Sequence, residues 1–347
     1  MSLAAATRPR PDRERDGLLV VDGASRSITA GRYGDLADHL SPGDLLVVND
    51  AATLPASLAG RATGGARMEL RLMAAEADDV FRAVSFGEGD HRTRTEDRDP
   101  GLPLARGAVL SFAGGLSATV IDADPERPRL VRVRFQTSDR RVAVLHAITR
   151  AGQPVQYAHV SEPLAAWDVQ TIFASRPWAV EIPSAARSFT HALLARVLSR
   201  GVRIAHLTHA AGLTSTGDPE IDRLLPLPER SEIPERTARL VAATRAEGRR
   251  IVAAGTSTTR ALESAFALHG EVRPGAFVST WTGSRETPLH VTDAILTGMH
   301  APPESHHELL RAFVDDDLLA RAAARAEELG FLAHELGDSM LVRRARP

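Results

Sequence analysis

Hydrophobic and polar residues follow two different patterns along this chain. Near its start, residues 18–21 and 45–48 form short continuous apolar runs, which are typical of strands covered on both faces of a sheet. The second run follows the Pro-Gly-Asp turn at 42–44 and ends at Asn49 and Asp50. These runs predict the first two strands of a layered α/β domain.

After Pro55 the pattern changes to short segments in which apolar and polar residues alternate. Glycine pairs at 64–65, 87 and 89, and 114–115 separate several of these segments. Alternation with turn-like spacing predicts a small antiparallel barrel or sandwich. The expected strands cover residues 57–61, 67–73, 80–86, 108–112, 116–121 and 130–135.

From about residue 180 onward, strand-like and helix-like patterns alternate. Repeated strand–helix–strand units favour a mostly parallel sheet with helices on both faces. The expected helices cover 190–199, 234–248, 260–269 and 318–329, and the expected strands cover 202–207, 251–254 and 340–342.

The predicted fold class is therefore α/β, a mostly parallel sheet flanked by helices, with an inserted small antiparallel β-barrel domain. Residues 1–55 are expected to form the first part of the α/β domain. Residues 56–152 are expected to form the inserted barrel, and residues 153–347 the remainder of the α/β domain.

Composition excludes several classes of function. The 347 residues are 43% hydrophobic and 25% charged, which suits a folded protein of about two domains. All 42 basic residues are arginine and there is no cysteine, so lysine Schiff bases, thiolate nucleophiles and cysteine-ligated metals are excluded. The net charge of −2 means that any RNA contact depends on a local patch. Without an 18-residue apolar run or a secretion signal, we expect a cytoplasmic protein with no membrane contact.

Polar residues follow the expected strands at the edge where such sheets bind ligands. Gly255 lets the backbone approach a ligand, and Thr256 and Ser257 lie beside the unpaired N–H groups of a helix start, which suits a carboxylate or phosphate. Ordinary capping by Ser or Thr is the alternative. A cation such as Arg260 is unfavourable at a helix start, which favours an anion-binding function for it.

Other polar residues leave two interpretations open. Asp50 is either a general base or hydroxyl clamp, or a carboxylate that stabilises a turn. The histidines at 206 and 209, and at 300, 306 and 307, have the spacing of metal ligands, but no cysteine or carboxylate motif accompanies them, so no metal is expected. The arginines at 132 and 134 share one face of a strand and either contact a phosphate backbone or, as we favour, lie on a solvated barrel face.

Six segments, in order along nearly the whole chain, carry a family resemblance. The segment PGDLLVVND at 42–50, with Pro55-Ala56 and Gly60-Arg61, is similar to PGDLLVFND…PA…GR, and GTSTTRALES at 255–264 is similar to GTTSVRTLES. The other matches are Thr63-Gly64-Gly65 with Glu69, Gln170-Thr171, Asp293 to Thr297 with His300, and Gly337 to Val342. Together they resemble the S-adenosylmethionine:tRNA ribosyltransferase-isomerases of queuosine biosynthesis, whose fold is an α/β domain with an inserted β-barrel.

The resemblance implies that the ribosyl part of S-adenosyl-L-methionine moves to the 7-aminomethyl-7-deazaguanine of tRNA and is isomerised, giving epoxyqueuosine, adenine and methionine. S-adenosyl-L-methionine is then the co-substrate and tRNA the partner. Such a reaction needs a base near C5′, a proton for adenine and polar groups on the ribose. The catalytic residues implied are Asp50, His300 and Glu263. The substrate-binding residues implied are Asn49, Thr208, Gly212, Gly255, Thr256, Ser257, Arg260, Thr297 and Asp338.

The chain also departs from the family's motifs. Ser188 stands where PTAGLHFT has histidine, His209 comes one position earlier than in TLHVGLGTF, and Glu229 keeps the acid of the HxMHSE segment without its histidines. These departures leave three alternatives open. One is a paralogue that binds S-adenosylmethionine but uses another acceptor or reaction, one is a catalytically silent RNA- or nucleotide-binding module, and one is a histidine–metal hydrolase.

Overall fold

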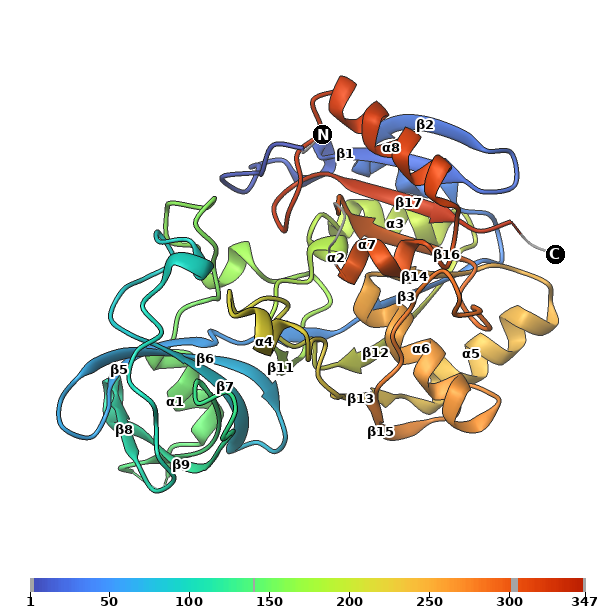
Figure 1. Ribbon diagram of the computed structural model, residues 1–347. Helices are drawn as coiled ribbons and strands as arrows, with labels where there is room; N and C mark the ends of the chain where they lie inside the picture. Colours follow the sequence, from blue (N-terminus) through green and yellow to red (C-terminus); the bar gives the residue numbers. More distant parts are fainter. Residues whose placement is uncertain (1–2, 140, 301–304, 346–347) are drawn as a thin grey trace.

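The computed structural model describes residues 3–139, 141–300 and 305–345 (Figure 1). Within these residues, the larger domain is built on a nine-stranded mixed sheet. In spatial order its strands are β15 (Gly275–Ser279), β13 (Glu229–Ile233), β12 (Arg203–His209), β3 (Leu45–Asn49), β14 (Ile251–Ala254), β16 (Ala294–Gly298), β17 (Ser339–Arg343), β1 (Gly17–Asp22) and β2 (Ser27–Arg32).

The centre of this sheet is parallel. Strands β12, β3, β14 and β16 pair in parallel, as do β1 and β17. The pairs β12–β13, β13–β15, β16–β17 and β1–β2 are antiparallel, so the sheet is parallel at its centre and mixed toward both edges. Parallel pairs need a long crossover, whereas antiparallel neighbours such as β1 and β2 need only a tight turn.

Helices cover both faces of the sheet because alternate side chains of its strands are apolar on both sides. Leu46 and Val48 of β3 belong to the core under α3 (His191–Ser199), whereas Leu45 and Val47 belong to the core under α5 (Glu235–Ala246) and α6 (Thr256–His269). Farther along the second face, α8 (Asp316–Glu328) packs on β1 and β17. The short helices are α2 (Ser184–Arg187), α4 (Pro219–Asp222) and α7 (Ser305–Leu310).

The smaller domain is a closed six-stranded antiparallel barrel, so the predicted fold class is confirmed. The alternating pattern located all six strands to within two residues at each end. They are β5 (Ser57–Arg61), β6 (Arg67–Ala75), β7 (Val80–Phe86), β8 (Val109–Phe112), β9 (Leu116–Ala123) and β10 (Leu130–Thr137), and α1 (Val144–Ala151) packs against them. The proposed boundaries at 56 and 152 stay a prediction.

Two short strands, β4 (Ala51–Thr53) and β11 (Arg176–Ala179), pair in parallel beside the main sheet. Figure 1 shows the barrel and the larger domain side by side, with the segment that carries α4 between them. None of the helices that the structure describes combines the length and the apolar character needed to cross a membrane.

The start of α6 differs from the sequence-based expectation. The helix begins at Thr256, not at Arg260. Gly255 makes the turn directly, with a φ of 102°, and the hydroxyls of Thr258 and Thr259 donate to the carbonyls of Ala254 and Gly255. These local bonds place the threonines inside the helix, and Arg260 therefore lies in its second turn.

Candidate active site

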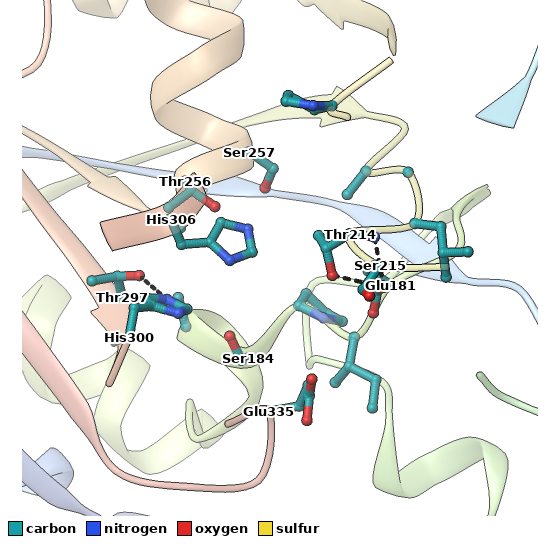
Figure 2. Close-up of a pocket in the computed structure, with 18 of the residues that line it drawn as sticks. Glu181, Ser184, Thr214, Ser215, Thr256, Ser257, Thr297, His300, His306 and Glu335 are labelled. Atoms are coloured by element: carbon teal, nitrogen blue, oxygen red, sulfur yellow. Dashed lines mark hydrogen bonds between the residues drawn. The ribbon is translucent and has the colours of Figure 1, made fainter. Parts of the chain in front are cut away.

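A cavity of about 1030 Å³ lies where the carboxyl ends of four parallel strands meet. Its lining includes Asn49 at the end of β3, Gly212 after β12, Gly255 after β14, and Thr297 and His300 at the end of β16. Parallel strands point the same way, so their ends bring these distant parts of the sequence to one edge of the sheet. Figure 2 shows side chains from several of these segments around the cavity.

One end of the cavity is formed by the start of α6, and we call it the helix end. No side chain caps this helix start, where Thr256 and Ser257 line the cavity. The Nη1 of Arg260 lies 2.5 Å from Oε2 of Glu229, and its Nε donates to the carbonyl of Trp281 at 3.2 Å. Among the described residues the buried Nη2 of Arg260 has no hydrogen-bond partner. A helix start with a buried guanidinium N–H is suited to bind an anion.

Glu229 is held in a buried network at the cavity wall. Its Oε2 lies 2.7 Å from Nε2 of His209, and its Oε1 accepts a hydrogen bond from the backbone N–H of Gly212 at 2.6 Å. The Nδ1 of His209 lies 2.7 Å from Oγ of Ser231. Burial by itself raises the pKa of Glu229, but the charges of His209 and Arg260 outweigh it, and the pKa is lowered. Glu229 therefore stays ionised at neutral pH.

Asn49 fixes the strand ends around the cavity. Its Nδ2 donates to the carbonyl of His209 at 2.9 Å, and its Oδ1 accepts hydrogen bonds from the N–H groups of Ala51 and His209, each at 3.0 Å. The same Nδ2 lies 3.4 Å from Oγ of Ser257. The side chain thus connects β3, the end of β12 and the start of α6.

Another part of the lining is rich in acids and rings. We call it the acidic end, and it consists of Tyr157, His159, Glu181, His334 and Glu335. Burial and the charge of Glu335 raise the pKa of Glu181. Burial by itself raises the pKa of Glu335. The hydrogen bond between Glu335 and His159 outweighs the effect of burial, so the pKa of Glu335 is lowered. This end therefore holds one carboxylate and one carboxyl group that ionises less readily.

The barrel contributes part of the cavity wall. Residues 94–96, in the loop after β7, line the cavity opposite the strand ends of the larger domain. Thr95 of this loop packs against Gly217, where a Cβ atom would lie 2.5 Å from the carbonyl carbon of Thr95. The cavity is thus completed by both domains.

Most of the residues singled out from the sequence lie together. Eight line the cavity: Asn49, Gly212, Gly255, Thr256, Ser257, Arg260, Thr297 and His300. The Nε2 of His300 lies 3.0 Å from Oγ1 of Thr297, and its ring lies 4.6 Å from the ring of His306, measured between centroids. His306 lines the cavity too.

Asp50 and Thr208 lie next to each other but outside this lining. Thr208 donates to Oδ1 of Asp50 at 2.6 Å, and Ser175 donates to Oδ2 at 3.0 Å. The Nδ1 of His206 lies 3.0 Å from the same Oδ2. Asp50 follows Asn49 on an extended chain, so the two side chains point in opposite directions.

Glu263 and Asp338 also lie outside the cavity lining, and both accept hydrogen bonds from backbone N–H groups. Glu263 is buried and accepts hydrogen bonds from the N–H groups of residues 290, 291 and 292, at 2.8 to 3.0 Å. Asp338 accepts hydrogen bonds from the N–H groups of Gly17 and Leu332, at 2.6 and 2.7 Å, and pairs with Arg10. Both contact sets are those of structural carboxylates.

The histidines that have metal-ligand spacing have separate partners. His209 is fully buried between Ser231 and Glu229, whereas His206 pairs with Asp50. A different group, His159, His334 and Glu335, places its ligand atoms within 4.8 Å of one another, a geometry that could hold a metal ion. The arginines at 132 and 134 pair with Glu76 and Asp79 on the barrel surface.

The sequence did not predict the acidic end, and Glu229 was not among the predicted site residues. Glu229 had a signal, because it keeps the acid of a family segment, but its burial beside Arg260 is a tertiary contact. The residues at 157 and 159 lie in a loop without a strand or helix pattern, and those at 334 and 335 precede the last strand. Nothing local marks these four residues as neighbours.

Comparison with known proteins identifies the family of this chain. The family model described as "Queuosine biosynthesis protein" matches residues 2–342. The chain belongs to this family. It is 31% identical over 340 residues to the S-adenosylmethionine:tRNA ribosyltransferase-isomerase of Trichlorobacter lovleyi, covering 96% of this chain and 94% of the relative. The protein of the same name from Anaeromyxobacter dehalogenans is 34% identical over 353 residues, which cover 98% of this chain and 95% of the relative.

A solved structure shares the fold. The crystal structure of the S-adenosylmethionine tRNA ribosyltransferase from Thermotoga maritima aligns with a TM-score of 0.54 and 22% sequence identity. The alignment covers 98% of each chain. The two chains therefore share a fold over nearly their whole length.

Proposed function

We propose that this protein transfers the ribosyl group of S-adenosylmethionine to the 7-aminomethyl-7-deazaguanine of tRNA and isomerises it, with release of adenine and methionine. The observation that carries the proposal is the near-complete match, at 30–34% identity, to relatives named for this activity. The charges around the cavity support it, because they complement a zwitterionic sulfonium nucleoside.

The helix end is suited to the methionine carboxylate. Within the described residues no side chain caps the N–H groups at the start of α6, and Thr256, Ser257 and Arg260 line the cavity there. Glu229, which stays ionised beside them, offers a negative charge to the sulfonium or the ammonium group. Salt bridges and charge-assisted hydrogen bonds of this kind orient a substrate strongly.

We assign proton transfer to His300, because this side chain reaches the cavity. His300 lines it and is oriented by Thr297, and histidine is the side chain most often used for proton transfer. Ser257 and Thr297 present hydroxyl groups suited to the ribose hydroxyls. Asp50, Thr208, Glu263 and Asp338 do not line the cavity, and in this proposal they position the segments that do.

The test incubates the full-length protein with S-adenosylmethionine and tRNA that carries 7-aminomethyl-7-deazaguanine. We expect stoichiometric release of adenine and incorporation of label from the ribosyl group into tRNA. The control is tRNA with unmodified guanine at the same position, which should give neither product.

The outcomes separate the alternatives. Adenine release without label in tRNA would favour a paralogue with a different acceptor. Binding of tRNA without binding of S-adenosylmethionine, measured by calorimetry, would contradict the proposal and indicate a silent binding module.

A further inference from the structure

The cavity lies at the upper end of the size range of small-molecule sites. Pockets for small molecules are usually about 300–1,000 Å³, and this one is about 1030 Å³. Its two ends also differ in charge, because the helix end offers N–H donors and the acidic end offers carboxyl groups. A cavity of this kind suits two different ligands side by side.

Glu181 has an oxygen available to a ligand. Its Oε1 accepts hydrogen bonds from the hydroxyl of Tyr157 at 2.7 Å, and from the backbone N–H and the hydroxyl of Thr214 at 3.0 and 3.1 Å. All side-chain hydrogen bonds seen for Glu181 within the described ranges go to Oε1, so Oε2 is the atom left for a ligand in the cavity. Figure 2 shows Glu181 beside Thr214 at the cavity wall.

Glu335 and three rings complete the acidic end. The Oε2 of Glu335 lies 3.2 Å from Nε2 of His159. The ring of His159 stacks on Tyr157, 6.3 Å away at an interplanar angle of 7°, and on His334, 4.6 Å away at 24°. Flat side-chain rings such as those of Tyr and His are groups on which proteins stack an unpaired nucleobase.

We propose that the acidic end binds the amine-bearing nucleobase that accepts the ribosyl group, with the carboxylate of Glu335 contacting its ammonium and Glu181 its ring N–H donors. This inference rests on the proposed function. The side chains fit the chemistry of such a base, which combines a primary amine, charged at neutral pH, with the N–H donors of a guanine edge. Carboxylates bind both kinds of donor through charge-assisted hydrogen bonds.

The same residues also contain the group that could hold a metal ion, His159, His334 and Glu335. One observation favours the base. A metal ion held by these three residues would leave Glu181 and the stacked Tyr157 ring without a function, whereas a base uses both.

The test compares two free bases by isothermal titration calorimetry: 7-aminomethyl-7-deazaguanine and 7-methyl-7-deazaguanine, which has no amine. We expect the wild-type protein to bind the aminomethyl base at least about tenfold more tightly, the equivalent of one charge-assisted hydrogen bond. Glu335→Gln should remove most of this preference, and Glu181→Gln should weaken both bases. The matched control is Glu328→Gln, an exposed carboxylate on α8 that should change neither.

Binding of S-adenosylmethionine is measured on the same variants and should be unchanged, which also shows that they are folded. A wild-type protein without a preference, or a preference that survives Glu335→Gln, overturns the inference. So does tight, equimolar zinc binding that His334→Ala abolishes, because the cluster is then a metal site. If the wild type fails to bind S-adenosylmethionine, the proposed function fails instead.

Discussion

At the scale of single residues, Arg260 combines burial with a hydrogen-bonding capacity that its protein partners do not use fully. It is about nine-tenths buried, and two of its guanidinium nitrogens are used by Glu229 and the carbonyl of Trp281. A buried guanidinium N–H without a partner is costly. Among the described residues the Nη2 of Arg260 has no partner, and Arg260 lines the cavity.

Arg260→Gln removes this donor and the charge. We expect the affinity for S-adenosylmethionine to fall by about 10- to 100-fold, because hydrogen bonds to charged groups contribute roughly 1.5–3 kcal/mol. Calorimetric titration measures the effect. Arg239→Gln, at an exposed ion pair on α5, is the matched control and should bind normally.

Glu263, for which the family resemblance implied catalysis, instead contacts backbone N–H groups in this structure, and we expect it to act on stability. Glu263→Ala leaves the three N–H groups at 290–292, two of them in buried hydrogen bonds, without their acceptor. We expect the free energy of unfolding to fall by about 2 kcal/mol or more, measured by urea denaturation. The affinity of the folded fraction for S-adenosylmethionine should be unchanged, and a selective loss of catalysis with normal stability would contradict this interpretation.

At the scale of elements, the barrel contains an excess of buried positive charge. Arg71 and Arg98 both pair with Glu69, whose oxygens lie 2.6 Å from Nε of Arg71 and from Nη1 of Arg98. Both arginine side chains are 1% exposed, and both guanidinium groups lie over the ring of Phe86. One carboxylate therefore balances two cations inside the barrel.

Glu69→Gln should destabilise the protein by about 3–5 kcal/mol, the usual effect of removing one partner of a buried ion pair. Urea denaturation measures this change. Glu76→Gln, at a half-exposed pair on the barrel surface, is the control and should cost less than about 1 kcal/mol.

The ionisation of Glu69 should also make the free energy of unfolding depend on pH. Burial by itself raises the pKa of Glu69, but the charges of Arg71 and Arg98 outweigh it and bring the pKa below the usual 4.5. A lowered pKa stabilises the fold above the unfolded-state pKa, and this contribution is lost as pH falls through the folded-state pKa. The difference in unfolding free energy between wild type and Glu69→Gln should therefore shrink below about pH 4.5. A constant difference down to pH 3 would contradict this assignment.

At the scale of the whole molecule, the cavity depends on the contact between the barrel and the larger domain. The barrel loop that carries residues 94–96 reaches the cavity and packs on Gly217. The Leu213 N–H donates to the carbonyl of Met73 in β6, a second connection between the domains. Shifting either contact therefore changes the shape of the cavity.

Gly217→Ala tests this dependence. The added Cβ atom would lie 2.5 Å from the backbone of Thr95, and the φ of 69° is strained for alanine. We expect a destabilisation of at least about 1 kcal/mol and weaker binding of S-adenosylmethionine. Gly270→Ala is the matched control, because it has a similar φ of 72° and nothing within 4 Å of its Cβ. It should lower stability but leave the affinity unchanged.

The sequence by itself determined the elements and most of one end of the cavity. Strand alternation located the six barrel strands, because side chains on a strand face opposite sides. The polar residues after β3 and β14 marked the helix end, because parallel strands end at one edge of a sheet. The sequence-based prediction placed the start of α6 four residues too late. The hydroxyls of Thr258 and Thr259 donate to backbone carbonyls one turn earlier, and composition does not reveal these hydrogen bonds.

Only the tertiary structure decided which polar residues meet. Asn49 and Asp50 are neighbours in sequence, but the pleat directs one toward the cavity and the other toward Thr208. The acidic end joins Glu181 to residues near 157 and 335, and no local pattern encodes such a distant contact. Periodicity is set by a residue's own backbone, whereas a binding site depends on how separate segments pack, and packing is a property of the whole chain.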